Sequence, residues 1–518
     1  MTDTIKLVEQ PVGSGKTYHV IRSIVNAGGL VIYCAPTKIL VNQIKADIEK
    51  VISLDEYHHR SHIPVDIVTE DDLGYCEKVS ERLEELILDT ENLEAIIVCT
   101  LPGFELVDEA VISKAVEELS KRITLVIDEL PSLFSPYHHA FEGTSYKRLA
   151  GGMITVENGI PRIDDSKQYG DTIKNKPFNE NVERLLELIP KETVRLEASK
   201  DNDKRTFYGY DLKTNLKANI MHIHSVYILA ATIRNTLDYI VLKDVWKFNL
   251  EDCEILNTKI EDDKIKEKEG NVRVYPLFDD KFSRGKATDK YKPITPDMNS
   301  CLFSMIENAI SFIGDKPALM MVNKWGMKTA SSYVNDKDNI KLLPPNIKGL
   351  NEYRDRHICC TIFSAKPNNI INQSLLLMAS KYSLTKLSDA FTLQAELDMI
   401  VQSCGRTSIR DRGTNEICHF LVSDMLQAQH VLDTYVADKS VHENLLDKSL
   451  MVNWSDYTTA KMGRPKSEER LEMGRDMIDQ LEYAKSIGEP MKQKELVRIF
   501  DVQESAVSKI LKDSGYKK

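Results

Sequence analysis

Residues 10–17 read QPVGSGKT, directly after a short apolar run over Ile5–Glu9. A strand, a glycine-rich loop, a Lys-Thr pair and a helix in this order are typical of a site that binds nucleotide phosphates. We expect the helix from about Thr17 to Asn26, with its positive N-terminus directed at the same anion. The stretch therefore predicts an α/β fold that binds a nucleoside triphosphate, and a glycine turn before a helix is the alternative.

The residues of this loop are expected to contribute to phosphate binding in different ways. The backbone amides of Gly13, Ser14 and Gly15 would surround a phosphate, because glycine allows the turn that points them inward. Lys16 would bring a positive charge, and Thr17 would offer its hydroxyl to Mg²⁺. The usual pattern begins with glycine where this chain has Gln10, and no role follows from the sequence for that residue.

The chain has 518 residues, of which 42% are hydrophobic and 28% charged. This length predicts roughly two to four domains, and the composition is that of a globular protein. No apolar run is long enough to cross a membrane, and the first strand begins too early for a signal peptide. We therefore expect a cytoplasmic protein of a prokaryote or of a phage-infected host cell, without membrane contact.

The net charge of −11 excludes a uniformly basic nucleic-acid-binding protein. Residues 461–518 alone have a small positive excess, with 13 Lys or Arg against 11 Asp or Glu. Nucleic-acid contacts of the larger part must therefore come from local grooves rather than from overall attraction.

The first domain, expected over 1–250, alternates buried strand-like runs with amphipathic stretches. This is the pattern of a parallel sheet covered by helices on both faces. The strand-like runs are Leu30–Pro36, Ala95–Leu101, Ile123–Leu130 and Ser225–Thr232, and helices are expected over Lys38–Ile52 and Val79–Leu88. A polar, glycine-containing insertion is expected at about 136–219, helical near Asn179–Glu187 and around Lys191–Glu197.

A second α/β pattern is expected over 251–457, after a charged linker at Glu261–Gly270. Its strand candidates are Asn271–Leu277, Pro317–Asn323, His357–Ala365 and Glu416–Ser423. Two such units predict a ligand cleft between them. The remaining residues, 458–518, predict a small all-α domain that begins with a basic arm.

Hydrolysis of a nucleoside triphosphate also needs a carboxylate for Mg²⁺ and a base for the attacking water. Asp128 and Glu129 end the apolar run TLVIDE, at the strand edge where open α/β sheets bind their ligands. Asp128 suits the Mg²⁺ site together with Thr17, and Glu129 suits the activation of water. A solvated strand end is the alternative for this pair.

With these residues in view, the sequence resembles the superfamily 2 helicases of the DEAD/DEAH-like kind, which are built from two RecA-like domains. The similar stretches run in family order and span about Ile5–Arg412. In the first domain they are the phosphate loop, CAPTKILVNQ at Cys34–Gln43, CTLPGF at Cys99–Phe104, DELP at Asp128–Pro131 and AAT at Ala230–Thr232. The resemblance implies ATP as the nucleotide, with Ala231 and Thr232 coupling hydrolysis to movement.

The resemblance continues in the second domain. GLNEYRD at Gly349–Asp355 resembles motif V, and QSCGRTSIR at Gln402–Arg410 resembles the QxxGRxxR motif. The resemblance implies that Gln402, Arg406 and Arg410 complete the catalytic site, with the arginines reaching phosphates held by the first domain. Two departures stand out. Ile409 occupies the usual place of the final arginine, and Pro131 replaces the residue that closes the DExx motif.

The resemblance also implies a groove for a single DNA strand. Pro36, Thr37 and Thr100 on one side, and Gly349 and Asn351 on the other, would hold its phosphates through hydroxyls and amides. Capping of the local loops is the alternative for each threonine.

The C-terminal stretch Lys492–Lys512 has apolar positions that fit two short helices meeting near Asp501 and Val502. It resembles a helix-turn-helix, and the arm GRPKS at Gly463–Ser467 extends the resemblance to the DNA-binding domain of resolvases and invertases. The residues expected on duplex DNA are Arg464 in the minor groove and Gln503, Ser505, Ser508 and Lys509 in the major groove. A helical hairpin and a solvated linker are the alternatives.

The expected fold is thus α/β, with two RecA-like parallel-sheet domains, an insertion in the first, and a small all-α helix-turn-helix domain. The expected function is that of an ATP-dependent DNA helicase or translocase, with ATP and Mg²⁺ in the interdomain cleft and duplex DNA at the C-terminal module. This arrangement suits replication initiation on a phage or plasmid, with replication proteins as further partners. The alternatives are a nucleotide-switched DNA-binding regulator that separates no strands and an RNA helicase, which the C-terminal module disfavours.

Overall fold

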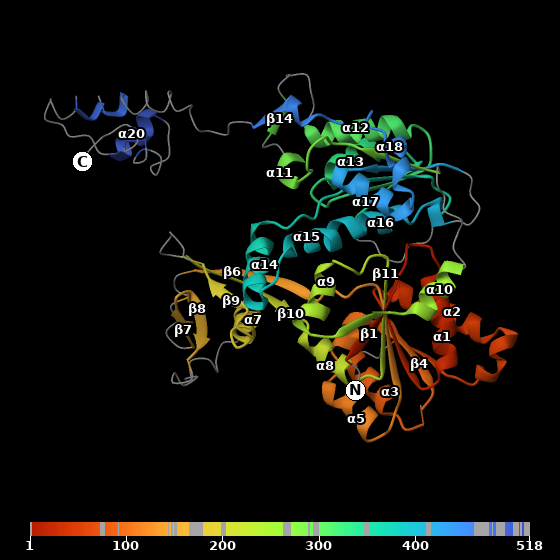
Figure 1. Cartoon of the computed structure of the whole chain (residues 1–518). Helices are drawn as coiled ribbons and strands as arrows, with labels where there is room; N and C mark the ends of the chain where they lie inside the picture. Colours follow the sequence, from red (N-terminus) through yellow and green to blue (C-terminus); the bar gives the residue numbers. More distant parts are fainter. Residues whose placement is uncertain are drawn as a thin grey trace. The chain divides into compact units, whose positions relative to one another are not determined.

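A computed structural model describes most of the chain. The described residues are 3–72, 78–91, 93–142, 145, 146, 149, 153–164, 180–197, 204–262, 271–287, 291–293, 300–345, 353–410, 416–459, 476–478, 480–482, 493–500, 507, 510 and 511. The chain divides into two units (Figure 1). The large unit comprises Met1–Arg284 and Cys301–Trp454, and the small unit comprises Gly285–Ser300 and Ser455–Lys518.

The first sheet of the large unit is parallel throughout, with seven strands in the order β12-β1-β11-β5-β2-β4-β3. The strands are β1 (Thr4–Glu9), β2 (Leu30–Ala35), β3 (Val65–Val68), β4 (Ala95–Thr100), β5 (Ile123–Asp128), β11 (Ser225–Ala230) and β12 (Asn249–Asp252). Every residue of β2 is buried. Such continuous apolar runs form strands here because both faces of the sheet are covered.

Helices pack on both faces of this sheet. One face carries α1 (Lys16–Ala27), α2 (Lys38–Ile52) and α10 (Glu254–Asp262), whose apolar side chains share one core. The other face carries α3 (Val79–Leu88), α4 (Leu101–Glu105), α5 (Glu109–Glu117), α8 (Thr214–His222) and α9 (Leu237–Ile240). Short helices η1 (Asp55–Arg60), η2 (Glu70–Asp72) and the π-helix η3 (Val241–Val245) complete this half.

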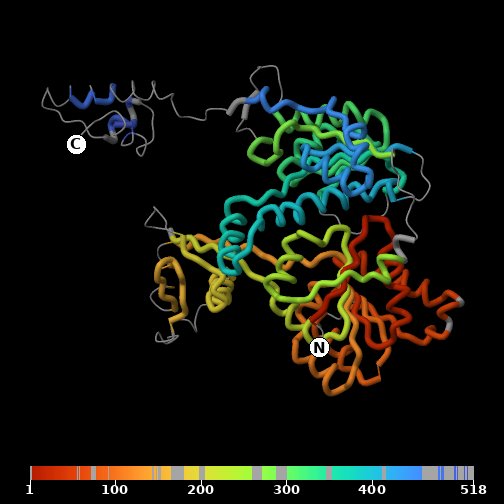
Figure 2. Tube along the Cα trace, in the orientation of Figure 1, coloured from red at the N-terminus to blue at the C-terminus, as the bar shows by residue number. Residues whose placement is uncertain are grey.

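Strand β1, which leads into the phosphate loop, takes both neighbours from residues far along the chain. It pairs with β11 on one side and with β12 on the other. Figure 2 shows the yellow-green segment that contains β11 and β12 running beside the red N-terminal strand. The first half thus extends past the expected border at 250, and Leu256 of α10 is buried in its core. The sequence placed the border too early because β12 (NLED) is a polar edge strand, and a short polar stretch of this kind resembles a loop in sequence.

The insertion between β5 and β11 is a small α/β structure with its own core. Its strands β6 (Phe134–Glu142), β10 (Lys204–Leu212) and β9 (Val194–Leu196) form an antiparallel sheet, beside the hairpin of β7 (Ile154–Glu157) and β8 (Ile160–Ile163) and the helix α7 (Glu180–Leu188). The helix expected near Asn179–Glu187 is present as α7. The helix expected around Lys191–Glu197 is wrong, because Val194 pairs with Gly209 of β10 and the segment is a strand.

The second sheet is also parallel and has five strands in the order β13-β18-β17-β15-β16. The strands are β13 (Val272–Pro276), β15 (Ala318–Val322), β16 (Ile340–Leu343), β17 (Ile358–Ile362) and β18 (Cys418–Val422). Its helices are α12 (Cys301–Ile313), α13 (Met327–Val334), α14 (Asn369–Tyr382), α15 (Leu387–Thr392), α16 (Asp398–Cys404), α17 (Met425–Tyr435) and α18 (His442–Leu445), with α11 (Arg284–Ala287) at the border of the units. Shorter turns are the π-helix η4 (Leu393–Leu397) and the 3₁₀-helices η5 (Ser408–Arg410), η6 (Lys439–Val441) and η7 (Trp454–Asp456). The expected pair of RecA-like parallel sheets is confirmed.

Helices α14 and α15 belong to the second half by sequence but pack against the first. Leu375 and Met378 of α14 lie in the core that also contains Tyr210 and Leu212 of the insertion. Ser374 Oγ donates to the Gly209 carbonyl oxygen at 2.5 Å. The two halves are therefore joined by apolar packing in addition to their contacts at the loop of residues 10–15.

The small unit contains an antiparallel pair, β14 (Tyr291–Pro293) with β19 (Tyr457–Thr459), and the helix α20 (Gln493–Phe500). One apolar cluster of this unit contains Met477, Leu481, Leu496, Val507, Ile510 and Leu511. Leu496, Val507, Ile510 and Leu511 belong to the apolar pattern of Lys492–Lys512 and are buried, whereas Ile499 of the same stretch is exposed. The turn of the expected helix-turn-helix, at Asp501 and Val502, lies outside the described residues.

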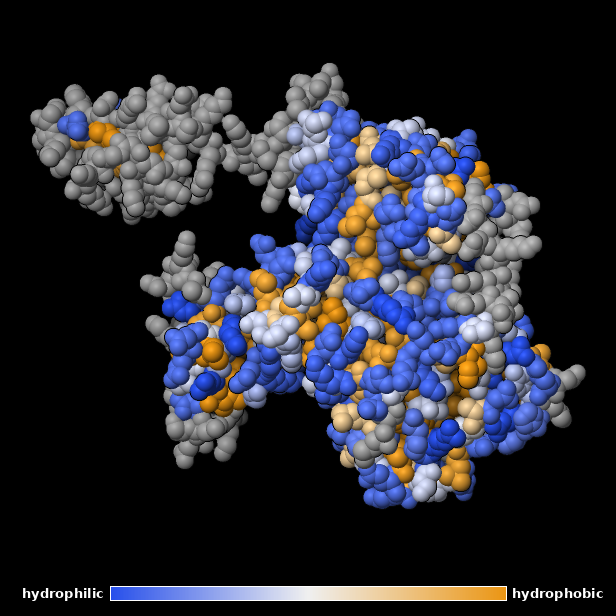
Figure 3. All heavy atoms as spheres, in the orientation of Figure 1, coloured by the Kyte–Doolittle hydropathy of each residue, from blue (hydrophilic) through white to orange (hydrophobic). Residues whose placement is uncertain are grey.

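Polar residues cover most of the face of the large unit seen in Figure 3. Apolar side chains gather inside the cores instead, as the fully buried strands β15 and β17 illustrate. In the described part of the chain, no helix combines the length and the apolar character needed to span a membrane.

Candidate nucleotide-binding site

The loop between β1 and α1 has the backbone of a phosphate cradle. Gly13 and Gly15 both have left-handed φ angles, of 83° and 85°, which glycine adopts without strain. Ser14 N donates to the Pro11 carbonyl oxygen at 3.3 Å and closes the turn. Gly13 is also needed for space, since a Cβ there would lie 3.3 Å from Cγ of Arg410. The loop is thus shaped both by its own turn and by an arginine of the second half.

Lys16 is the first residue of α1, and its ammonium group lies inside the loop. Nζ donates to the carbonyl oxygen of Gln10 and, at 2.9 Å, to that of Pro11. The pKa of Lys16 falls to about 8, chiefly because burial penalises its charge, while Asp128 and Asp398 act in the opposite direction. A phosphate would replace the carbonyl oxygens as a charged acceptor and restore the preference for the ammonium form.

Gln10 contributes to the loop through its backbone. Its carbonyl accepts from Lys16, and its N–H donates to the Ala230 carbonyl oxygen at 3.2 Å, at the end of β11. The residue is 6% exposed. Gln10 therefore ties the start of the loop to the strand that leads into the Ala230–Thr232 segment, which the sequence alone did not reveal.

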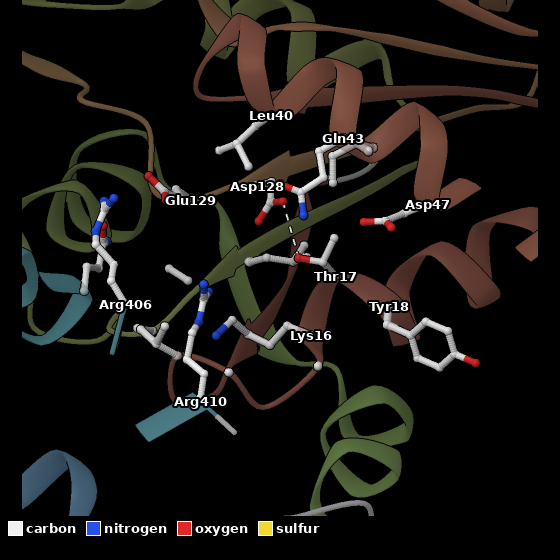
Figure 4. Close-up of a pocket in the computed structure, with 18 of the residues that line it drawn as sticks. Lys16, Thr17, Tyr18, Leu40, Gln43, Asp47, Asp128, Glu129, Arg406 and Arg410 are labelled. Carbon is white, nitrogen blue, oxygen red and sulfur yellow. Dashed lines mark hydrogen bonds between the residues drawn. The ribbon is translucent and has the colours of Figure 1, made fainter. Parts of the chain in front are cut away.

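Asp128 ends β5 and faces the loop. Its Oδ2 accepts from Thr17 Oγ1 at 3.5 Å (Figure 4). The same oxygen accepts from the Tyr33 hydroxyl at 2.9 Å. The pKa of Asp128 rises to about 6, first through burial and then through the charge of Glu129. A divalent cation would favour the ionised carboxylate, so this acid suits the Mg²⁺ position expected for it.

Glu129 follows directly, with a left-handed φ of 79°. Its N–H donates to the Leu229 carbonyl oxygen at 2.7 Å, which fixes the turn at the end of β5. Non-glycine residues with positive φ are uncommon and concentrate at functional sites. The turn brings the Glu129 side chain into the same pocket as Lys16 and Asp128.

The opposite wall of the pocket comes from the second half. Arg406 and Arg410 follow α16 and reach the pocket (Figure 4). Gln402 of α16 also lines it. Arg406 is 6% exposed, and its Nε and Nη1 atoms meet no hydrogen-bond partner among the described residues. Burial lowers the pKa of Arg406, while Glu129 acts against the shift. Buried guanidinium donors without acceptors fit a polyanionic ligand, and so does the buried Oγ of Ser14, which also lacks a described partner.

The pocket has a volume of about 550 Å³, enough for a nucleotide. It is lined by Val12, Gly13, Gly15, Lys16, Thr17, Tyr18, Leu40, Gln43, Ile44, Asp47, Asp128, Glu129, Leu229, Ala230, Ala231, Arg354, Gln402, Arg406 and Arg410. The first fifteen of these come from the first half and the last four from the second. The expected cleft between two α/β halves is therefore present. Ten of the residues named from the sequence line it, whereas Ser14 and Thr232 are not among the lining residues; the ten are Gly13, Gly15, Lys16, Thr17, Asp128, Glu129, Ala231, Gln402, Arg406 and Arg410.

Asp398 is a site residue that sequence reasoning missed. Gln402 Nε2 donates to Asp398 Oδ2 at 2.8 Å, one turn along the same helix. The pKa of Asp398 rises to about 6, chiefly through burial, and the Thr232 hydroxyl is the largest influence in the other direction. Asp398 thus connects Gln402 of the second half with Thr232 of the first. Its position four residues before Gln402 was the only available signal.

The segment that contains Ala231 and Thr232 is anchored to β1. Glu9 Oε1 accepts from the backbone N–H groups of Ile233 and Arg234, at 2.6 and 3.1 Å. The Arg234 guanidinium bridges Glu9 at 2.7 Å and Asp252 of β12 at 2.6 Å. These contacts hold the segment against the strand that leads into the phosphate loop.

The threonines expected to contact nucleic acid are helix caps in the structure. Thr37 Oγ1 accepts from Leu40 N at 3.4 Å, and Thr100 Oγ1 accepts from Gly103 N at 3.4 Å. Both lie at the carboxyl ends of the neighbouring strands β2 and β4, and Pro36 precedes the first cap. The other residues expected on nucleic acid, Gly349, Asn351, Arg464, Gln503, Ser505, Ser508 and Lys509, lie outside the described part of the chain.

Residues 2–143 match the family model of the DEAD/DEAH box helicases. The match covers β1 to β6, including the phosphate loop and the Asp128–Glu129 pair. It confirms the expectation of an ATP-hydrolysing enzyme of the nucleic-acid helicase kind. No curated protein matches the sequence.

Several solved structures are similar to the chain at low identity. The Xpd4 structure of S. tokodaii has a TM-score of 0.46 and 11% identity over 86% of this chain and 96% of its own. S. cerevisiae Dbp5 bound to RNA and ADP BeF3 has a TM-score of 0.36 and 9% identity over 87% and 84%. The Mycobacterium smegmatis helicase Lhr, bound to ssDNA and AMP-PNP, has a TM-score of 0.34 and 12% identity over 97% of this chain and 51% of its own.

Proposed function

We propose that the chain is an ATP-dependent DNA helicase or translocase, whose nucleotide pocket lies between its two parallel-sheet halves. One observation carries the proposal. Lys16, Thr17 and Asp128 of the first half share a single pocket with Arg406 and Arg410 of the second. A site built from two halves changes when they separate, so its chemistry is suited to driving movement.

The residues of the pocket supply the parts of a phosphoryl transfer to water. The loop amides and Lys16 would bind the β- and γ-phosphates, and Glu129 would orient and activate the attacking water. Arg406 and Arg410 would stabilise the charge that develops on the γ-phosphate. Thr17 and Asp128 would hold Mg²⁺, which neutralises phosphate charge when bound. Gln402, held by Asp398, would position the γ-phosphate side of the site.

The buried donors of Arg406 support a cycle of closing and opening. A triphosphate would give Nε and Nη1 the acceptors that they lack among the described residues, and would hold the halves together. Hydrolysis and phosphate release would remove these acceptors. Burial of an unpaired guanidinium is costly, so the halves would then move apart. Ala231 and Thr232, next to Asp398, would transmit this movement.

The nucleic-acid contacts proposed for the large unit use neutral groups. Thr37 and Thr100 already cap α2 and α4, so their hydroxyls organise two neighbouring helix N-termini at one sheet edge. The backbone amides that follow Pro36 on this side, and those of Gly349 and Asn351 on the other, would contact a strand's phosphates. Such contacts suit a chain with a net charge of −11.

The finer assignment, to DNA and to replication, rests on the C-terminal module. We propose that Arg464 enters the minor groove and that Gln503, Ser505, Ser508 and Lys509 read the major groove. A motor tethered in this way to one DNA site suits the initiation of phage or plasmid replication, where replication proteins would join it. A DNA-binding regulator switched by nucleotide, without strand separation, is the competing function.

The test measures ATP hydrolysis and the unwinding of forked duplexes for the wild type and for Lys16→Ala. Lys341→Ala, on the exposed side of the edge strand β16, is the matched control. We expect forked DNA to stimulate hydrolysis by the wild type and the control, and both to open the fork, whereas Lys16→Ala does neither. Hydrolysis stimulated by DNA on a fork that stays closed would favour translocation or the regulator. Stimulation by RNA alone would overturn the assignment to DNA.

A further inference from the structure

Tyr33 lies in the middle of β2, where an apolar side chain would be expected. Every residue of this strand is buried, and Tyr33 is fully shielded from solvent. Its side chain shares the core with Val31 and Ala35, between the sheet and the helices α1 and α2. A phenolic hydroxyl at this depth needs a hydrogen-bond partner, because an unpaired one would destabilise the fold.

The partner of Tyr33 is the carboxylate at the nucleotide pocket. Its hydroxyl donates to Asp128 Oδ2 at 2.9 Å. The strand register explains the contact, since Tyr33 is paired with Val126 and Asp128 lies two residues further along the same face of β5. An aromatic side chain is long enough to reach this diagonal neighbour. The donor is thus held by a strand that is buried on both sides.

Thr17 donates to the same oxygen, but at 3.5 Å. The proposed function assigns the Thr17 hydroxyl to Mg²⁺. With the metal bound, Thr17 would therefore not be the residue that orients the Asp128 carboxylate. The shorter bond comes from Tyr33, which does not line the pocket and has no expected contact with the ligand. The two hydroxyls therefore have separable roles on one carboxylate oxygen.

We propose that Tyr33 is a positioning residue that fixes the orientation of the Asp128 carboxylate for Mg²⁺. This inference rests on the proposed function, because it takes Asp128 as the residue that serves the metal. Tyr33 acts through Asp128, because its side chain is fully buried and does not line the pocket. A donor carried by a buried strand holds the carboxylate more rigidly than one carried by a loop.

The test compares Tyr33→Phe with Tyr137→Phe. The control also removes a buried tyrosine hydroxyl, which donates to the Asn181 carbonyl oxygen at 3.0 Å in the insertion. Binding of a fluorescent, non-hydrolysable ATP analogue is measured in EDTA, and Mn²⁺ binding to the same complex is measured by electron paramagnetic resonance. We expect Tyr33→Phe to bind the analogue in EDTA within about twofold of wild type but to bind Mn²⁺ roughly 10-fold more weakly. The control should match the wild type in both.

Asp128→Asn separates this inference from the proposed function. If Asp128→Asn binds Mn²⁺ as the wild type does, the metal role that the proposed function gives to Asp128 is wrong, and the positioning role of Tyr33 is overturned with it. If Asp128→Asn loses Mn²⁺ while Tyr33→Phe titrates like the wild type, only the positioning role is overturned. Tyr33→Phe should add nothing to the loss in the double variant, because both changes remove the same interaction.

A second measurement keeps the tyrosine in place in case Tyr33→Phe does not fold. 3-Fluorotyrosine is incorporated at position 33 alone, and its ¹⁹F resonance is followed. The resonance should shift when Mg²⁺ is added to the complex with the analogue, and should stay in place with the analogue in EDTA. A resonance that does not respond to Mg²⁺ contradicts the inference.

Discussion

Gly405 of the second half packs directly against Val12 of the phosphate loop, which lines the nucleotide pocket. A Cβ built on Gly405 would lie 2.6 Å from Val12 Cγ1 and 3.0 Å from the Tyr435 hydroxyl. Gly405 has a φ of −65°, so alanine would adopt its backbone without strain, and the effect of the added methyl group is steric. The second half can approach the phosphate loop this closely only because residue 405 has no side chain.

Gly405→Ala should therefore lower ATP turnover by pushing Arg406 away from the loop. We expect a decrease of at least about 10-fold in kcat/KM, since small displacements of aligned groups are costly. Gly326→Ala is the control, because its Cβ would lie 2.8 Å from Val322 Cγ1 in the second half, away from the pocket. It should reduce the melting temperature but leave the turnover of folded protein unchanged. Equal turnover in both variants would mean that the approach of Gly405 to Val12 has no part in catalysis.

Arg406→Ala should separate catalysis from stability. We expect kcat to fall by about 10³-fold, as for other arginines that reach a transferring phosphate, with a smaller change in KM. The free energy of unfolding should not decrease, because Nε and Nη1 are buried without described partners and their removal relieves a desolvation cost. Arg356→Ala is the contrast. That guanidinium donates to the Ala318 and Asn339 carbonyl oxygens at 2.7 and 2.8 Å, so its loss should destabilise the protein. Calorimetry and steady-state kinetics decide both points.

Asp398 predicts a specific dependence of stability on pH. Its pKa rises from an ordinary 3.8 to about 6 in the folded protein, so the folded state binds this proton more tightly than the unfolded chain does. Stability should therefore fall as pH rises from about 4 to about 6, with the full cost present above that range.

Asp398→Asn removes the ionisation and should be more stable than wild type at pH 8, by roughly 2 to 3 kcal/mol. The gain should disappear below about pH 4, where the wild-type carboxyl is protonated in both states. Thermal unfolding of both proteins between about pH 4 and pH 8 measures this difference in stability. Asp438→Asn, at an exposed carboxylate whose pKa is lowered by the Ser440 hydroxyl, should show no gain at pH 8. An Asp398→Asn advantage that is constant with pH would contradict the burial of a charged group.

The packing of α14 on the first half predicts a contrast within one helix. Met378→Ala should lower the free energy of unfolding by about 2 to 5 kcal/mol, because Met378 is fully buried in the core shared with the insertion. Leu376→Ala, at a side chain that is 69% exposed, should change it by less than about 0.5 kcal/mol. Similar small effects for both would show that α14 is not held there in solution.

Deletion of 461–518 should weaken the binding of duplex DNA by at least about 10-fold and spare ATP hydrolysis in the absence of DNA. The expected reason is that the tether and the nucleotide pocket use different parts of the chain. Fluorescence anisotropy with a duplex and a coupled ATPase assay measure the two. A truncated chain that loses both activities would refute a separate tether.

The sequence predicted correctly those helices and strands whose apolar residues follow a regular spacing within the segment itself. The helices expected over Lys38–Ile52 and Val79–Leu88 coincide with α2 and α3, because their apolar residues recur on one helical face. The buried strands were recognisable as β-branched apolar runs. The error at Lys191–Glu197 has a tertiary cause, since Val194 becomes a strand residue only through its pairing with Gly209.

The candidate site was predictable where a motif carries the chemistry, as in Gly13–Thr17, Asp128 and Arg406. Asp398 and Tyr33 were not predictable, because one resembles a surface acid on a helix and the other a core residue of a strand. Their roles depend on partners that only the fold brings close. Gln10 illustrates the same limit, since its contribution is made by a carbonyl oxygen and no side-chain pattern could reveal it.

The placement of β1 between β11 and β12 affects how the protein can be made and divided. During synthesis, the strand that leads into the phosphate loop has no partner until the chain has grown through β11 to Ala230, and it gains its second partner only at Asp252. Pairing across such a separation gives a high contact order, which slows folding and leaves strand edges open to aggregation. A fragment that ends near residue 143 would keep the loop sequence but would lack β11 and β12, the two strands that flank β1. The nucleotide pocket therefore forms late in folding. A fragment that contains only the N-terminal motifs should not form a working ATPase site.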